Sequence, residues 1–348
     1  MSAKEFFTNG NQTDMLKTKI IVGGLLFFIA VSCTQKKPAE STKPARTVQV
    51  PRFNSDSAYF FVDKQVKFGP RVPNTKSHRQ ASDYFISQFK RYGATVTTQD
   101  FEATTWDNQR VQLKNIIASY NPDAQKRILL AAHWDTRPFA DKDETKKNAP
   151  FDGANDGASG VGVLLEIARA INQSNKPDVG VDLILFDGED WGKDSSTGQE
   201  SKIEMPEGYG DWWCLGSQYW SKHKHVKNYS AYYGILLDMV GSKHAQFFRE
   251  GGSLEFAPSV VEKVWDTGTK LGYTDYFVKT NVSAITDDHV FVSELAKIPM
   301  IDIVHYQNGM GFFGDYHHST KDNMSIISKE TLGAVGSTLL NVVYYEEK

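Results

Sequence analysis

The sequence predicts an α/β protein with a single globular domain, built on a central, mostly parallel but mixed β-sheet that helices flank. Three short apolar runs, β-branched or rich in leucine, are typical of buried strands: residues 127–133, 181–187 and 233–239. Stretches with apolar residues at helical spacing alternate with these runs, and such alternation implies parallel strands covered on both faces. The roughly 300 residues after the N-terminal segment show no change of composition that would indicate a second domain.

The N-terminal segment, residues 1–33, is typical of a bacterial lipoprotein signal. From Met15 the chain has lysines, then an apolar run too short for a membrane-spanning helix, then small residues before Cys33. The sequence Ala-Val-Ser-Cys at 30–33 resembles a lipobox, so we expect Cys33 to be the lipidated first residue of the mature chain. An ordinary secretory signal with an incidental cysteine is the alternative. Residues 1–14 are polar and precede this second start, which suggests an upstream extension.

Residues 34–52, rich in Lys, Pro, Ser and Thr, predict a flexible tether. Residues 53–348 are predicted to form the globular domain. The protein is therefore expected to be exported and lipid-anchored, facing the periplasm or the cell surface of a Gram-negative bacterium. With Cys33 lipidated, Cys214 has no partner for an intramolecular disulfide. Acidic residues slightly outnumber basic ones, 42 against 39. The chain therefore lacks the excess of positive charge that is typical of nucleic-acid-binding proteins, and no nucleic acid partner is expected.

The elements follow in order along the domain. Residues 77–92 have apolar side chains at helical spacing and are flanked by predicted strands at 94–101 and 111–119. The remaining predictions are strand 127–133, a glycine-rich loop with helix 159–171, strand 181–187, strand 233–239, helix 258–271, strand 299–304 and a closing helix near 329–346. Two long loops, 191–216 and 305–319, contain aromatic residues and glycines, and loops of that length in a compact domain are usually functional.

Carboxylates and histidines follow the predicted strands at the points where they end. Ligands bind at the carboxyl ends of the strands in an open α/β sheet, so these residues are expected to meet there. A hydrolytic Zn²⁺ needs neutral imidazole and carboxylate ligands, an open position and a spare carboxylate that carries protons. The candidates are His133, Asp135, Asp156, Glu189, Asp190, Asp238 and His318.

Each candidate also has a structural alternative. His133 and Asp135 are two apart, so one can be a ligand and the other its orienting carboxylate, or His133 can simply bond its neighbour. Asp156 stands between glycines before a helix, where an N-cap aspartate is common. Adjacent Glu189 and Asp190 are costly to bury unless a cation compensates one or one holds a proton.

The remaining carboxylate and histidine are less specific by themselves. Asp238 ends an apolar strand, where an uncompensated carboxylate is costly to bury. His318 follows His317 in a loop rich in glycine and aromatic residues, and either could be a surface residue. Together, the residues of this set at successive strand ends predict a metal site.

The order of these residues resembles that of the zinc aminopeptidase-like superfamily. The matching pattern is H-x-D, then Asp in a glycine loop, then E-[E/D], then Asp, then His. Within the superfamily, the chain is similar over residues 55–346 to the glutaminyl cyclases of the animal and bacteroidete type. The residues that carry this resemblance are FGPRVP at 68–73, Glu189-Asp190 in DGEDWG, Asp287-Asp288-His289 and HHSTKDN at 317–323.

This resemblance implies one catalytic zinc held by Asp156, Asp190 and His318. It makes Glu189 the general acid and base, with the carboxylates of Asp238 and Asp287 positioning it and the substrate amine. His133 and Asp135 match groups that bind a second metal in the peptidases but are not needed for it in the cyclases.

Two positions depart from the family pattern. Asp190 stands where Glu is frequent, and His317 where animal cyclases have a pocket tryptophan. The aromatic wall of the substrate pocket could instead come from other residues, although each by itself could equally be a packing residue. The candidates for the wall are Trp191, Trp212, Trp213, Phe312, Phe313 and His317.

The implied activity is zinc-dependent cyclisation of N-terminal glutamine in peptides or proteins to pyroglutamate, with release of ammonia. This would make the protein a glutaminyl-peptide cyclotransferase, an acyltransferase of the aminoacyltransferase type. The main alternative is a secreted zinc aminopeptidase with one or two metals, because the same residue types serve both reactions. A third hypothesis is a non-catalytic binding protein of the same fold, which would be expected to have lost ligands.

Overall fold

The computed structural model describes residues 48–306 and 313–347. The predicted signal segment with Cys33, most of the predicted tether, and Phe312 lie outside these residues. A six-stranded sheet has the order β1-β2-β4-β3-β5-β8. Its strands are β1 (Thr95–Thr104), β2 (Arg110–Tyr120), β3 (Arg127–His133), β4 (Gly180–Phe186), β5 (Tyr233–Asp238) and β8 (Met300–Val304).

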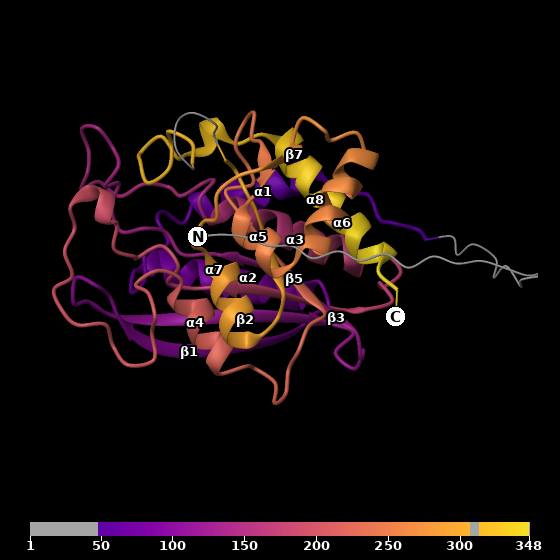
Figure 1. Ribbon diagram of the computed structural model, residues 1–348, viewed down its shortest axis with the longest axis horizontal. Helices are drawn as coiled ribbons and strands as arrows, with labels where there is room; N and C mark the ends of the chain where they lie inside the picture. The colour runs from indigo at the N-terminus through magenta and orange to yellow at the C-terminus, as the bar shows by residue number, and fades with distance from the viewer. Residues whose placement is uncertain (1–47, 307–312, 348) are drawn as a thin grey trace, which may run out of the picture. The chain divides into compact units, whose positions relative to one another are not determined.

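The sheet is mixed. Strands β4, β3, β5 and β8 run parallel, whereas β2 pairs antiparallel with β4 and β1 with β2. The predicted mostly parallel, mixed sheet with flanking helices is therefore confirmed. β6 (Phe247–Arg249) and β7 (Phe277–Asn281) form a separate small sheet. Figure 1 shows the arrangement, with helices α1 (Ser55–Val66), α2 (Lys76–Arg91), α3 (Ala158–Asn172), α4 (Leu215–Lys222), α5 (Gly251–Phe256), α6 (Pro258–Lys270), α7 (Asp288–Phe291) and α8 (Lys329–Tyr345).

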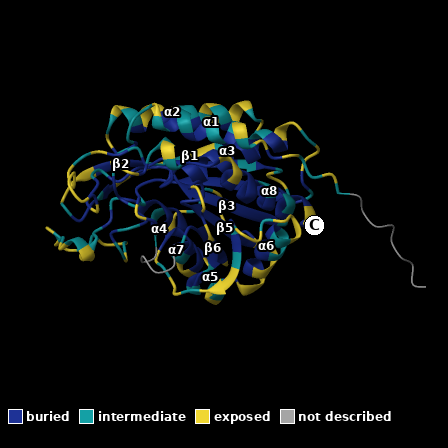
Figure 2. Cartoon of the chain, turned by 90° about the horizontal axis from the view of Figure 1, so that it is seen from above, coloured by how far each residue is buried: buried dark blue, intermediate teal, exposed yellow. Residues whose placement is uncertain are grey.

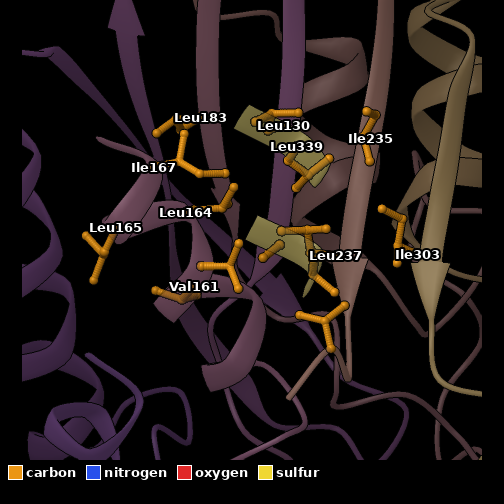
Figure 3. Packing of buried hydrophobic residues seen from close by; sticks show 14 of the residues in the cluster. Leu130, Val161, Leu164, Leu165, Ile167, Leu183, Ile235, Leu237, Ile303 and Leu339 are labelled. Atoms are coloured by element: carbon orange, nitrogen blue, oxygen red, sulfur yellow. The ribbon is translucent and has the colours of Figure 1, made fainter. Parts of the chain in front are cut away.

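Both faces of the parallel strands β3, β4, β5 and β8 are buried, as Figure 2 shows by the dark central strands, whereas the edge strand β1 is mostly exposed or half-buried. Successive side chains of a strand point to opposite faces. On one face, Leu130 of β3 packs with side chains of α1, α3, α6 and α8, and Figure 3 shows Leu130 and Leu183 among α3 residues such as Leu164. On the other face, Leu129 packs with Trp220 of α4. Burial on two sides explains why β3, β4 and β5 are apolar without alternation.

The predicted elements are all present, with ends that differ by up to three residues. Sequence reasoning missed α1, α4, α5, α7 and the small sheet of β6 and β7. These elements are short or only weakly amphipathic, so periodicity gives little indication of them. Among the described residues, no helix combines the length and apolar character that crossing a membrane requires.

Candidate active site

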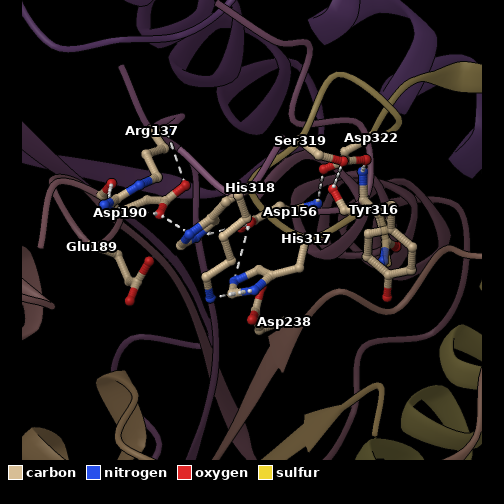
Figure 4. A network of polar contacts seen from close by, with 12 residues as sticks. Arg137, Asp156, Glu189, Asp190, Asp238, Tyr316, His317, His318, Ser319 and Asp322 are labelled. Carbon is tan, nitrogen blue, oxygen red and sulfur yellow. Dashed lines mark hydrogen bonds and ion pairs between the residues drawn. The ribbon is translucent and has the colours of Figure 1, made fainter. Parts of the chain in front are cut away.

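The parallel strands end at the same level, and this brings the predicted site residues together. His133 at the end of β3 is paired in register with Phe186 at the end of β4. Glu189 and Asp190 follow β4 by a short turn, and Asp238 ends β5 on the other side of β3. Figure 4 shows Asp156, Asp190 and His318 from three different segments facing one another.

Asp156 reaches this edge because the loop before α3 packs closely against β3. Gly157 follows Asp156 in a left-handed conformation, with φ of +82°. A Cβ atom there would lie 2.8 Å from the carbonyl oxygen of Asp135 and 3.0 Å from Cε1 of His133. Only glycine allows this approach without strain.

Asp156, Asp190 and His318 converge in the way that ligands of one metal ion do. Nε2 of His318 lies 3.0 Å from Oδ1 of Asp190 and 3.7 Å from Oδ2 of Asp156. Both carboxylate oxygens are buried without a hydrogen-bond partner among the described residues. Nitrogen and oxygen ligands on a tetrahedral zinc are about 3.3 Å apart. The two separations from His318 and the unpartnered carboxylate oxygens are therefore consistent with a zinc ion held by these side chains.

The electrostatics of the three residues also fit a cation. Burial, and then the charge of Asp156, raise the pKa of Asp190 well above its ordinary value. Burial, and then His317, lower the pKa of His318 well below its ordinary value. Two buried carboxylates beside a neutral imidazole repel each other unless a cation compensates them. Neutral imidazole is also the form that binds metals.

His317 lies next to this group but is less well placed. Its Nε2 is 4.0 Å from Oδ2 of Asp156, and its Nδ1 is 3.2 Å from Nζ of Lys142. Asp156, His317 and His318 nonetheless form one group whose ligand atoms all lie within 4.8 Å of one another. The 3.0 Å between Nε2 of His318 and Oδ1 of Asp190 favours His318 as the ligand.

His133 connects two carboxylates. Its Nε2 lies 3.0 Å from Oδ1 of Asp156 and 3.2 Å from Oδ1 of Asp238. Its other nitrogen, Nδ1, lies 3.6 Å from Oδ1 of Asp135 and 3.8 Å from Oε2 of Glu189. His133, Asp156 and Asp238 form a second group of the kind that could hold an ion.

Asp135 holds the turn that carries the two adjacent acidic residues. Its Oδ1 accepts a hydrogen bond from the backbone N–H of Glu189 and its Oδ2 one from that of Asp190, each 3.1 Å long. Asp135 is completely buried. Asp135 therefore fixes the backbone of Glu189 and Asp190 and does not line the cavity.

Three further residues position the site and were not predicted in these roles. Arg137 donates its backbone N–H to Oδ2 of Asp190, at 2.9 Å. Asp322 accepts the backbone N–H groups of Asn155 and Asp156, at 2.7 and 3.0 Å. Arg71 is fully buried and donates to the carbonyl oxygen of Gly153 at 2.8 Å. Arg71 and Asp322 stand inside the FGPRVP and HHSTKDN motifs, and Arg137 follows Asp135 by two residues, but the contacts of all three depend on distant chain segments.

Glu189 faces the cavity, unlike Asp190. Its side chain is 13% exposed against 1% for Asp190. Burial is the main cause that raises the pKa of Glu189 well above its ordinary value, and Asp287 and Asp190 add to it. A carboxylate with a raised pKa beside a metal site can exchange protons near neutral pH.

A cavity of about 240 Å³ lies in front of these groups. Asp238 and Asp287 line it together with Glu189, Asp156 and His318, as the predicted roles require. The aromatic side chains that line it are Trp213, Phe313 and His317. The ring of Trp213 stacks on His318, with centroids 5.8 Å apart.

Two of the predicted pocket residues lie elsewhere. Trp191 packs against the cluster of Phe101 and Leu113, and Trp212 is buried without lining the cavity. The expectation that either forms the pocket wall is therefore corrected. The physical reason is that the 191–216 segment turns its aromatic side chains in different directions, which composition does not reveal.

The chain is similar to known proteins in sequence and in fold. The sequence model described as peptidase family M28 matches residues 115–343. A glutaminyl cyclase from Bacteroides thetaiotaomicron, solved with bound N-acetylhistamine, is 47% identical with a TM-score of 0.80, over 86% of this chain and 100% of that one. A Zn-dependent exopeptidase from Parabacteroides distasonis is 48% identical, also with a TM-score of 0.80 and the same coverage. A glutaminyl-peptide cyclotransferase from Dictyostelium discoideum is 23% identical over 91% of this chain and 95% of its own length.

Proposed function

The chain belongs to peptidase family M28, and on that premise we propose that it is a zinc-dependent glutaminyl-peptide cyclotransferase. The observation that carries this proposal is the similarity, at 47% identity and over the full length of that protein, to a bacteroidete glutaminyl cyclase. The substrates are peptides or proteins with N-terminal glutamine, and the products are pyroglutamyl peptides and ammonia.

The side chains around the cavity support the chemistry. Zinc held by Asp156, Asp190 and His318 would supply Lewis acidity toward the γ-carboxamide oxygen of the substrate. The substrate's own α-amine attacks the carboxamide carbon, so that a new C–N bond closes the ring and the bond to the amide nitrogen breaks. Proximity is thus built into the substrate, and the protein must mainly orient it and move protons.

Glu189 is the residue that we assign to proton transfer. It lies beside the proposed ligand Asp190 and reaches the cavity. In this role its carboxylate takes the proton that the amine loses and returns it to the departing nitrogen, which leaves as ammonia. Asp238 and Asp287, which line the same cavity, hold the amine and restrict the orientation of Glu189.

We propose one zinc ion per chain. Nε2 of His133 lies 3.0 Å from Oδ1 of Asp156 and 3.2 Å from Oδ1 of Asp238. The imidazole ring thereby occupies the space between these two carboxylates, where a second ion would bind. The same residues could instead hold a second ion, and this observation favours the runner-up, a zinc aminopeptidase. In that enzyme Glu189 would activate water instead of an amine.

The location of the protein is a separate proposal, supported by the sequence alone. We propose that Cys33 is lipidated and that residues 34–52 tether the catalytic domain to the membrane, on the periplasmic side or at the cell surface. One acyl chain binds membranes only marginally, so stable anchoring requires more than one at Cys33.

One assay separates the two activities. The purified protein is given Gln-peptides and aminoacyl amides, and ammonia and free amino acids are followed separately. A cyclase releases ammonia from Gln-peptides and leaves the peptide chain intact, whereas an aminopeptidase releases free amino acids from both substrates. Release of amino acids without cyclised product would refute the proposed activity.

A further inference from the structure

A buried thiol lies directly behind the proposed proton carrier. Sγ of Cys214 is 3.4 Å from Oε1 of Glu189. The residues are tied through the backbone as well, because the N–H of Cys214 donates to the carbonyl oxygen of Glu189 at 3.1 Å and the next N–H donates to that of Gly188 at 3.0 Å. Cys214 is fully buried and stands at the N-cap of α4 with a left-handed φ of 59°. The position of the sulfur relative to Glu189 is therefore fixed by the fold.

Asp287 completes the group. One ligand atom each from Glu189, Cys214 and Asp287 can be chosen so that all three lie within 4.8 Å of one another. A sulfur and an oxygen that bind the same tetrahedral zinc are about 3.5 Å apart, given metal–sulfur and metal–oxygen bonds of about 2.3 and 2.1 Å. The 3.4 Å between Sγ and Oε1 matches this separation.

A second, independent observation points to a cation here. The neighbouring Asp288 is fully buried, and neither of its carboxylate oxygens has a hydrogen-bond partner among the described residues. A bound cation would compensate this excess of buried acidic groups.

We propose that Glu189, Cys214 and Asp287 form a second cation site, specific for thiophilic divalent ions, in which a bound ion disables Glu189. The ligand set determines the specificity, because a thiolate favours zinc or cadmium over magnesium or calcium. An ion enters through the cavity, which Glu189 and Asp287 line. The inhibitory part rests on the proposed function, since a metal-bound Glu189 cannot accept the amine proton.

The site is tested on full-length protein loaded with one equivalent of zinc, which fills the catalytic position; the protein is titrated with Cd²⁺ and the ultraviolet charge-transfer absorption of cadmium–thiolate bonds is recorded. The chain has two cysteines, so Cys33→Ser is the matched control. We expect the absorption in the wild type and in Cys33→Ser, and its loss in Cys214→Ser. If serine disturbs folding, Cys214→Gly serves instead, because glycine accepts the left-handed conformation.

Two further measurements distinguish a metal site formed by three residues from binding of Cd²⁺ by the thiol alone. Asp287→Asn should raise the Cd²⁺ concentration for half-saturation by roughly 10- to 100-fold, the range seen when even outer partners of a metal are removed. Ammonia release is then measured with and without added Cd²⁺, each protein being its own reference. Wild-type turnover should fall as the absorption appears. Cys214→Ser should need a Cd²⁺ concentration at least roughly ten-fold higher for the same loss of turnover.

No charge-transfer absorption in the wild type, its persistence in Cys214→Ser, or unchanged affinity in Asp287→Asn would overturn the site. Equal inhibition of wild type and Cys214→Ser would overturn the disabling of Glu189. Failure of the proposed function is distinguishable, because turnover on Gln-peptides would then be missing in every protein while the cadmium–thiolate absorption remained.

Discussion

Nε2 of His318 lies 3.0 Å from Oδ1 of Asp190, yet that oxygen has no hydrogen-bond partner among the described residues. Oδ2 of Asp156, 3.7 Å from the same nitrogen, is also without one. Buried polar atoms in folded proteins nearly always have partners. These two unpartnered oxygens lie on either side of the same imidazole nitrogen at short distance, and this relationship is the basis for proposing zinc between the three side chains.

The first prediction concerns His318. Replacing it with Ala removes one of three proposed ligands and leaves two carboxylates close together without their cation. Zinc content and ammonia release should fall together. His317→Ala is the matched control, because its ring stands beside that of His318, with centroids 3.7 Å apart, and it should keep its zinc. Elemental analysis that finds full zinc in His318→Ala and none in His317→Ala would move the ligand role to His317.

The second prediction concerns Asp135, whose two oxygens accept the backbone N–H groups of Glu189 and Asp190. Asp135→Asn keeps one acceptor and replaces the other with a donor, so one buried N–H loses its partner at a cost of about 1–3 kcal/mol. We expect a lower melting temperature and a lower kcat with little change in KM. Unaltered kcat in a folded Asp135→Asn protein would show that the turn does not depend on this contact.

The sheet, and the meeting of most site residues at one edge of it, can be predicted from the sequence for a physical reason. Buried parallel strands have continuous apolar runs, and polar residues such as His133 and Asp238 stand where these runs end. Since the carboxyl ends of parallel strands meet, the order of the residues is enough to expect the cluster of carboxylates and histidines.

Other parts depend on contacts that no local pattern encodes. Cys214 comes beside Glu189 only because the start of α4 pairs with the turn after β4. The direction of the aromatic rings in 191–216, which places Trp213 in the cavity and Trp191 in a packing cluster, is likewise set by tertiary structure. The contacts of Arg137 and Asp322 are also hidden from the sequence, because Arg137 donates its backbone N–H and Asp322 accepts backbone N–H groups. Such backbone groups are present in almost every residue and leave no sequence pattern.

The third prediction concerns pH and Glu250, the N-cap residue of α5. Burial alone would raise the pKa of Glu250, but hydrogen bonds with His289 and Ser253 lower it from 4.5 to about 2. A carboxyl whose pKa is lower in the folded state stabilises the fold above its unfolded pKa and loses this contribution as pH falls. Glu250 should therefore contribute up to about 3 kcal/mol at neutral pH, lost between pH 4.5 and 2.

Glu250→Gln tests this contribution. The free energy of unfolding of the variant should be lower than that of the wild type at pH 7, and the difference should shrink as pH falls from 4.5 toward 2. Urea unfolding at several pH values measures it. A difference that stays constant over this range would contradict the ionic role of Glu250.

The fourth prediction tests the proposed anchor. Cys33→Ser should prevent lipidation and release the protein from membranes, while its turnover on Gln-peptides stays that of the wild type. Fractionation of cells fed with labelled fatty acid measures both location and lipidation. Label on the Cys33→Ser protein together with continued membrane association would exclude Cys33 as the anchor.

Ammonia release from a Gln-peptide by zinc-replete Glu189→Gln is the sharpest test of Glu189 as the proton carrier. Glutamine keeps the shape and hydrogen bonding of the side chain but cannot accept the amine proton. Turnover should therefore fall by roughly two to four orders of magnitude while zinc stays bound. Near-normal turnover with zinc in place would contradict the role of Glu189, and loss of zinc would make Glu189 the ligand and Asp190 its partner carboxylate.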